Sequence, residues 1–292
     1  MFTEIAPRPA LPVRIYRALA PTVRYWLQTE VHVFAFSISA NVLLAFFPFL
    51  IVSISVSQIF FSRDTTVGAI DFALRSYFPD ALAQFLHSDQ RDNLPLVGRR
   101  PEFVSILLLL FTANGIFEPL EVALNHVWGI HKNRSFLRNQ IVSLGLIFVC
   151  GGLALFSLGL TALNHPSLGS SANPVESWIT GVILKLLAVP LSAVILFLVY
   201  RFLPNGKPPL TRVVPAAIGV GVLLEVMKYV NALVWPRMQV KLANEYGVFR
   251  YSVMLIFLSF IASMLVLAGA EWSSRGHRFD RAVDENAREG AD

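Results

Sequence analysis

Residues 31–62 decide the class of fold and read VHVFAFSISANVLLAFFPFLIVSISVSQIFFS. The stretch contains no Asp, Glu, Lys or Arg, and it is bounded by Glu30 and Arg63. It is longer than the roughly 20 apolar residues that cross a bilayer as a helix. It is also too long for the apolar region of a cleavable signal peptide. The sequence therefore predicts a membrane protein whose first transmembrane helix is an uncleaved anchor.

The overall composition supports this class. Hydrophobic residues make up 55% of the chain and charged residues 15%, whereas soluble domains are about a quarter charged. The net charge of +5 would suggest nucleic-acid binding in a soluble protein. Here basic residues that flank apolar spans and orient them are the simpler explanation, and no nucleic-acid partner is expected. The single cysteine, Cys150, excludes an internal disulfide.

The remaining apolar runs predict an all-α integral membrane protein with six transmembrane helices. A cytoplasmic segment of residues 1–30 precedes the membrane domain of residues 31–272, and residues 273–292 form a polar cytoplasmic tail, expected to be disordered beyond Arg281. Residues 13–29 suit an amphipathic interfacial helix, with a solvated tail as the alternative. Two further short surface helices are expected at 69–77 and 81–86. The six spans are expected at about 34–61, 103–124, 141–163, 178–200, 213–235 and 251–270.

The distribution of Lys and Arg predicts the orientation. Fourteen lie in the segments on the side of the two termini, and eight lie in the segments on the other side. The longer loop counts for less, because the bias acts mainly in short loops. Both termini are therefore predicted to be cytoplasmic.

Ionisable residues inside the spans are the main candidates for function, because each costs on the order of 2.5–3.5 kcal/mol unless it is paired or hydrated. Glu225 and Lys228 share one face of the fifth span. Lys185 in the fourth span is expected at a similar depth, roughly 10 Å below the outer surface. Two interpretations remain open. The three residues form a binding or proton-coupled site in a hydrated cavity, or they form a structural ion pair that locks two helices.

The first and second spans contain further polar residues. Asn41 and Pro48 suggest either an unwound backbone that exposes carbonyl groups near a cavity, or a proline kink with Asn41 bonded to a neighbouring helix. Glu118 and Glu121 share a face near the inner end of the second span, which is either one long helix or a broken one. They could line a vestibule, but pairing with Arg134 or Arg201 is the favoured interpretation.

No sequence motif indicates an enzyme. The six histidines are scattered, and no run provides the spacing of metal ligands. No glycine-rich phosphate loop with Lys-Ser or Lys-Thr is present. We therefore expect no catalytic residues, no metal and no cofactor.

An ordered set of motifs resembles a known family. They are Ala35-Phe-Ser-Ile-Ser-Ala-Asn-Val-Leu-Leu-Ala-Phe-Phe-Pro48, Leu124-Asn125 with the later Arg134, Tyr200-Arg-Phe-Leu-Pro204, Pro215-Ala-Ala with Glu225 and Lys228, Tyr246-Gly247, and Gly269-Ala-Glu271. Together they are similar to the YihY/BrkB family of bacterial inner-membrane proteins, formerly described as ribonuclease BN. The resemblance implies a six-span helical protein in the bacterial cytoplasmic membrane. Envelope integrity and transport have both been suggested as roles of that family.

Three hypotheses for the function follow. In the first, a transporter-like protein moves or positions a small solute, ion or lipid through a polar cavity between spans one, two, four and five. The second is a non-catalytic envelope integrity or assembly factor that uses the glycines of the third span. The third and weakest is a membrane-bound ribonuclease. The bilayer is the expected partner in each case, and the oligomeric state, a homo-oligomer included, stays open. The residues assigned to the cavity are Asn41, Pro48, Glu118, Lys185, Glu225 and Lys228.

Overall fold

The computed structural model describes residues 20–60, 62, 66, 70, 103–130, 135–163 and 190–289. Within these residues the regular structure is entirely helical, which confirms the all-α prediction for this part of the chain. The long helices are α2 (Thr29–Phe60), α5 (Phe103–Trp128), α6 (Phe136–Leu163), α8 (Leu210–Tyr246) and α9 (Arg250–Glu289). Shorter helical segments cover residues 20–26 and Pro190–Phe202, and the 3-10 turn η3 covers Gly247–Phe249.

Three helices in the described part of the chain are long and apolar enough to cross a membrane. They are α2, α8 and the Arg250–Arg275 part of α9. Their outward-facing side chains are largely apolar, as with Phe36 on α2, which is 57% exposed, and Leu233 on α8, which is 74% exposed. Large apolar surfaces of this kind are unfavourable in water but suit contact with lipid chains.

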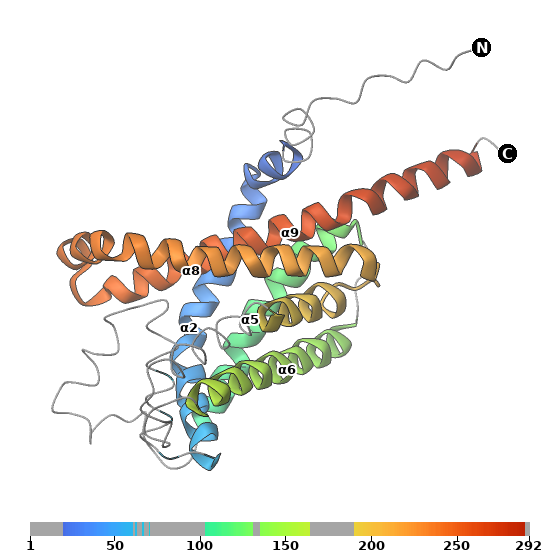
Figure 1. The fold of residues 1–292 in the computed structure, drawn as a ribbon. Coiled ribbons are helices and arrows are strands. Elements are labelled where there is room, and N and C mark those ends of the chain that lie inside the picture. Colours follow the sequence, from blue (N-terminus) through green and yellow to red (C-terminus); the bar gives the residue numbers. More distant parts are fainter. Residues whose placement is uncertain are drawn as a thin grey trace, which may run out of the picture.

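The helices pack as a bundle in which α2 contacts both α5 and α9, and α8 runs beside α9 (Figure 1). The turn η3 joins α8 to α9 as a hairpin. Gly247 ends α8 with φ 54°, and its N–H donates to the carbonyl of Ala243. Glycine suits this position because a positive φ is unfavourable for residues that carry a Cβ.

One end of the bundle collects many of the polar contacts between elements. We call it the terminal end, formed by residues 20–30, 121–130, 200–212 and 264–275. The N–H of Asn205 donates to Oδ1 of Asn125 over 2.7 Å. The hydroxyl of buried Tyr200 donates to the carbonyl of Val266 over 2.6 Å. The segments thus meet around one core.

The packing at this end is close. A Cβ at Gly269 would lie 2.2 Å from Cγ2 of Val220 and 2.8 Å from the hydroxyl oxygen of Tyr200. Glycine at this position lets α9 approach α8 and the end of Pro190–Phe202, as small residues do between membrane helices. The fixed positions of these segments in turn orient the side chains described below.

The structure decides between two alternatives for individual helices and corrects the expectation for the C-terminal tail. Helix α2 is continuous through Pro48, so the backbone is not unwound there. A proline removes one helical hydrogen bond, and membrane helices tolerate this where neighbouring groups compensate. Helix α5 is continuous through Pro119, so the second span is one long helix. Helix α9 extends to Glu289, so the tail expected to be disordered beyond Arg281 is helical as far as that residue, because no proline follows Pro236 to end it.

Two other expectations fall outside the residues that the structure describes. Apart from residue 70, the surface helices expected at 69–77 and 81–86 lie outside the described residues. Lys185 also lies outside them.

Candidate functional site

A polar strip on the buried side of α8 is the candidate site inside the apolar bundle. It consists of Glu225, Lys228 and Asn231, which are spaced three residues apart and therefore lie along one side of the helix. The Nζ of Lys228 lies 2.5 Å from Oε2 of Glu225, and the two side chains are 19% and 11% exposed. Asn231 is 5% exposed. The structure thus confirms that Glu225 and Lys228 share a face, and it adds Asn231 to them.

The opposite side of α8 is apolar and exposed. Val222, Val226 and Leu233 are each at least 44% exposed, in contrast to the polar strip. A soluble helix buries its apolar face and exposes its polar one, so α8 has the reverse arrangement. Charged residues within membrane helices usually face the bundle interior in the same way.

The polar strip lies deep in the apolar part of α8. Glu225 is fifteen residues beyond Leu210, where the helix begins, or about 22 Å along its axis. That distance falls within a hydrocarbon core of about 30 Å. One turn before Glu225, a Cβ on Gly221 would lie 3.3 Å from the backbone N of Ala193. Residues four apart share a helix face, so the strip continues the face that contacts Pro190–Phe202.

The Glu225–Lys228 ion pair joins neighbouring turns of one helix. By itself it does not lock two helices together, which was one interpretation of the sequence. The pairing lowers the free energy that burying two separate charges would require. It also places an ammonium group and a carboxylate in contact in the bundle interior. Such a pair of opposite charges is able to separate around a small ion.

The other predicted cavity residues are distributed over the bundle. Asn41 donates from Nδ2 to the carbonyl of Ser37 in its own helix over 2.9 Å. Its side chain also fills the space beside Gly115 of α5, where a Cβ would be 2.2 Å from Oδ1. Pro48 is buried, and Glu118 is exposed. Their assignment to one cavity with the polar strip stays a prediction.

The predicted pairing of Glu118 or Glu121 with Arg201 is replaced by other contacts. Arg201 donates from Nη1 to the carbonyl of Pro208 over 2.7 Å. Glu121 is 5% exposed, and its Oε1 lies 3.5 Å from Nδ2 of Asn125. Arg134, the other expected partner, lies outside the described residues.

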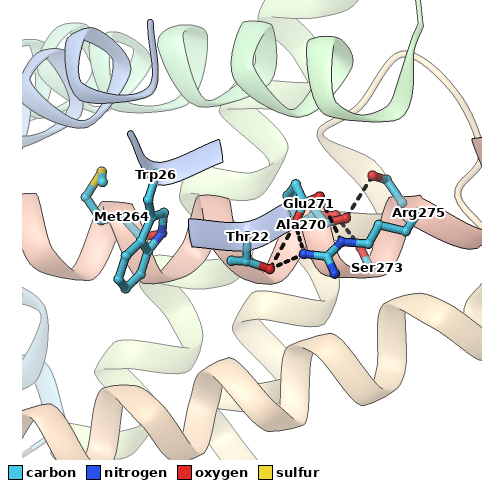
Figure 2. Close-up of polar contacts among 8 residues, drawn as sticks. Thr22, Trp26, Met264, Ala270, Glu271, Ser273 and Arg275 are labelled. Carbon is cyan, nitrogen blue, oxygen red and sulfur yellow. Dashed lines mark hydrogen bonds and ion pairs between the residues drawn. The ribbon is translucent and has the colours of Figure 1, made fainter. Parts of the chain in front are cut away.

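A second polar group, at the terminal end, was not anticipated (Figure 2). Arg275 donates from Nε to Oε1 of Glu271 over 2.8 Å and from Nη2 to Oε2 over 2.6 Å. Thr22 donates to Oε2 of Glu271 over 3.1 Å, and its hydroxyl also accepts from Nη2 of Arg275. We call these three residues the terminal cluster. The spacing of Glu271 and Arg275 was a local signal for their pairing, but no local signal pointed to Thr22.

The terminal cluster and Trp26 attach the N-terminal segment to α9. Trp26 donates from Nε1 to the carbonyl of Met264 over 3.0 Å (Figure 2). Residues 20–26 are therefore a helix that is docked on the bundle, and the alternative of a solvated tail is wrong for these residues. A cavity of about 290 Å³ lies beside this helix, lined by Ala20, Pro21, Arg24, Tyr25, Gln28, His126, Val127 and Glu271.

In the part of the chain that the structure describes, no three His, Cys, Asp or Glu side chains gather as a potential metal site.

The sequence is similar to known proteins over most of its length. Residues 22–291 match the family model described as virulence factor BrkB. A UPF0761 membrane protein of Pseudoalteromonas translucida is 25% identical over 78% of this chain and 75% of its own length. A UPF0761 membrane protein of Aromatoleum aromaticum is 25% identical over 85% of the chain, but the match covers only 61% of that relative. The ribonuclease-like protein YfkH of Bacillus subtilis is 25% identical over 84% of the chain and 89% of its own length. No solved structure matches the chain.

Proposed function

Because this chain belongs to the BrkB virulence-factor family of membrane proteins, we propose that it is a six-span protein of the bacterial cytoplasmic membrane that moves or positions a small solute, ion or lipid. Its relatives are named as membrane proteins, and three described helices are suited to crossing a bilayer. The bilayer is its proposed partner, and the proposal includes no nucleic acid.

The directions of the described helices support the six-span topology. At the terminal end α5, Pro190–Phe202 and α9 arrive, whereas α2 and α8 leave, as the contacts of Asn125, Tyr200 and Met264 indicate. Six spans with both termini on one side require this alternation. The excess of Lys and Arg in the segments on this side favours a cytoplasmic location for the terminal end.

The observation that carries the transporter-like role is the buried ion pair of Glu225 and Lys228. Apolar residues of similar volume would pack α8 at a lower desolvation cost than two charges. Ionisable residues within membrane helices often mark ion or substrate pathways. A pair that opens to receive a proton, an ion or a charged headgroup accounts for both residues at this depth.

Reconstituted protein tests the role. Proteoliposomes are assayed for flux of small ions, of zwitterionic solutes and of fluorescent phospholipids, against protein-free liposomes. We expect flux of one class by the wild-type protein and at least a roughly tenfold loss in Glu225→Gln and Lys228→Ala, as for one lost interaction with a charged group.

The matched controls are Lys241→Ala and Glu245→Gln. Lys241 and Glu245 form an exposed ion pair near the end of the same helix, with Nζ 3.9 Å from Oε1. These variants should retain flux. Unchanged flux in correctly folded Glu225→Gln and Lys228→Ala protein would reject the role.

A second candidate, an envelope assembly factor, is favoured by the glycines of α6. A Cβ on Gly145, Gly151 or Gly152 would meet no atom within 4 Å in the described part of the chain. A membrane helix of another protein could approach closely there. Phe148 is 65% exposed and shares a helix side with Gly145 and Gly152. Photo-crosslinking from this position in membranes should then recover a defined partner, and recovery of lipid alone would speak against this candidate.

We expect no ribonuclease activity, although one relative is named ribonuclease-like. The chain lacks recognisable sequence motifs for metal-assisted phosphodiester cleavage. Metal-dependent RNA cleavage by the purified protein, abolished by a single substitution, would reverse this expectation.

A further inference from the structure

The cavity at the terminal end has a different character from the polar strip on α8. Its walls come from the docked helix of residues 20–26, Gln28 in the turn that follows it, the end of α5, and α9. Its volume of about 290 Å³ is at the lower limit of the roughly 300–1,000 Å³ of small-molecule sites. A compact polar group fits such a space, whereas a drug-sized molecule does not.

The charges around the cavity favour an anion. Glu271 lines it, but both carboxylate oxygens accept from Arg275, so this negative charge is compensated. Arg24 also lines it, and its guanidinium makes no ion pair with another residue of the described chain. The uncompensated charge in the lining is therefore positive.

Further hydrogen-bonding groups accompany Arg24. The amide of Gln28 and the imidazole of His126 line the same space. Nδ1 of His126 lies 3.9 Å from Oε2 of Glu30, whose side chain is 70% exposed and does not line the cavity. A guanidinium with five N–H donors beside an amide is suited to bind the oxygens of a phosphate group.

The surroundings of the cavity indicate its position relative to the bilayer. Val23, on the same short helix as Arg24, is 51% exposed, and Leu27, in the turn that follows this helix, is 76% exposed. A helix that presents apolar residues next to arginine is typical of the boundary between headgroups and acyl chains. Trp26 is hydrogen-bonded to α9 and holds the helix there. An anion at this level is most readily supplied by a phospholipid.

We propose that the cavity bounded by Arg24, Gln28, His126 and Glu271 binds the phosphate of a phospholipid headgroup. The acyl chains would lie beside the exposed Val23 and Leu27. The site is separate from the polar strip on α8, and the proposal does not depend on transport. It assigns the docked N-terminal helix the role of one wall of a lipid site.

Binding to the delipidated full-length protein in detergent tests the proposal. The probes are dioleoyl phosphatidylglycerol, dioleoylglycerol, which has the same chains without the phosphate, and glycerol 1-phosphate, which has the phosphate without the chains. Arg24→Gln should weaken binding of phosphatidylglycerol about tenfold, as expected for loss of a charged hydrogen-bond donor. Arg138→Gln, at an exposed position near the start of α6 outside the cavity, is the matched control and should not change it.

Ala20→Phe supplies an independent variant, because it places a ring in the cavity without removing a charge. It should also weaken binding of phosphatidylglycerol. Equal binding of dioleoylglycerol would overturn the proposal, and so would an equal loss in Arg24→Gln and Arg138→Gln. Glycerol 1-phosphate that binds as tightly as the lipid would show a site for a soluble phosphate ester and exclude the lipid assignment.

Discussion

The polar strip on α8 and the terminal cluster both contain a carboxylate paired with a cation, but they are built differently. In the strip, Glu225 and Lys228 are neighbours on one helix, deep in an apolar segment. In the terminal cluster, Glu271 and Arg275 also share one helix, yet Thr22 joins them from 249 residues away in the sequence. The first is a local feature of a span, and the second attaches a separate segment to the bundle.

The two pairs differ in how well water can solvate a charge that has lost its partner. Removal of one member of the strip leaves the other as a charge in the apolar interior, where little water is present to solvate it. Arg275 and Glu271 of the terminal cluster are 25% and 15% exposed, but they lie at the end of the apolar part of α9, where the proposed topology brings water close enough to replace a lost partner. Substitutions in the strip should therefore have larger effects on stability than comparable ones at the terminal cluster.

The largest effect is expected for Glu225→Ala, which leaves Lys228 without its carboxylate partner. We expect a loss of about 3 kcal/mol in the free energy of unfolding, as for a broken buried ion pair. Titration with SDS in mixed micelles measures it. The double variant Glu225→Ala/Lys228→Met should recover part of the loss, because no buried charge remains. A double variant less stable than Glu225→Ala would contradict this account of the strip.

A smaller effect is expected for Gly269→Ala, beside the terminal cluster. The new Cβ would meet Val220 and the hydroxyl of Tyr200, both of which are held in a packed core. Overpacking of this kind costs about 1–3 kcal/mol, measured by the same titration. Gly151→Ala is the matched control, because its Cβ would enter open space in the described chain, and alanine favours helix formation. Equal destabilisation by both changes would show that helix contact is not the cause.

The same contrast explains how much the sequence could predict. Glu225 and Lys228 were identifiable because charges are rare within apolar runs and because helical spacing fixes their relation. At the helix ends charges are common, so the spacing of Glu271 and Arg275 indicated a pair but not its role, and nothing distinguished Arg24. The contact of Thr22 with Glu271 depends on how residues 20–26 dock, which is a property of tertiary packing. Local pattern left two interpretations open for Asn41 and Pro48, and the structure shows a continuous α2 in which Asn41 lies against Gly115.

The smallest effect, and the one that separates the two regions most clearly, is expected for Trp26→Phe. The change keeps an aromatic ring against α9 but removes the Nε1 hydrogen bond to the carbonyl of Met264. A single neutral hydrogen bond contributes about 1 kcal/mol. Hydrogen–deuterium exchange should become faster in residues 20–26 while the middle of α8 keeps its protection, because the bond attaches only the docked helix. Faster exchange at Glu225 as well would mean that the N-terminal helix and the polar strip open together, and the two regions would then form one cooperative unit.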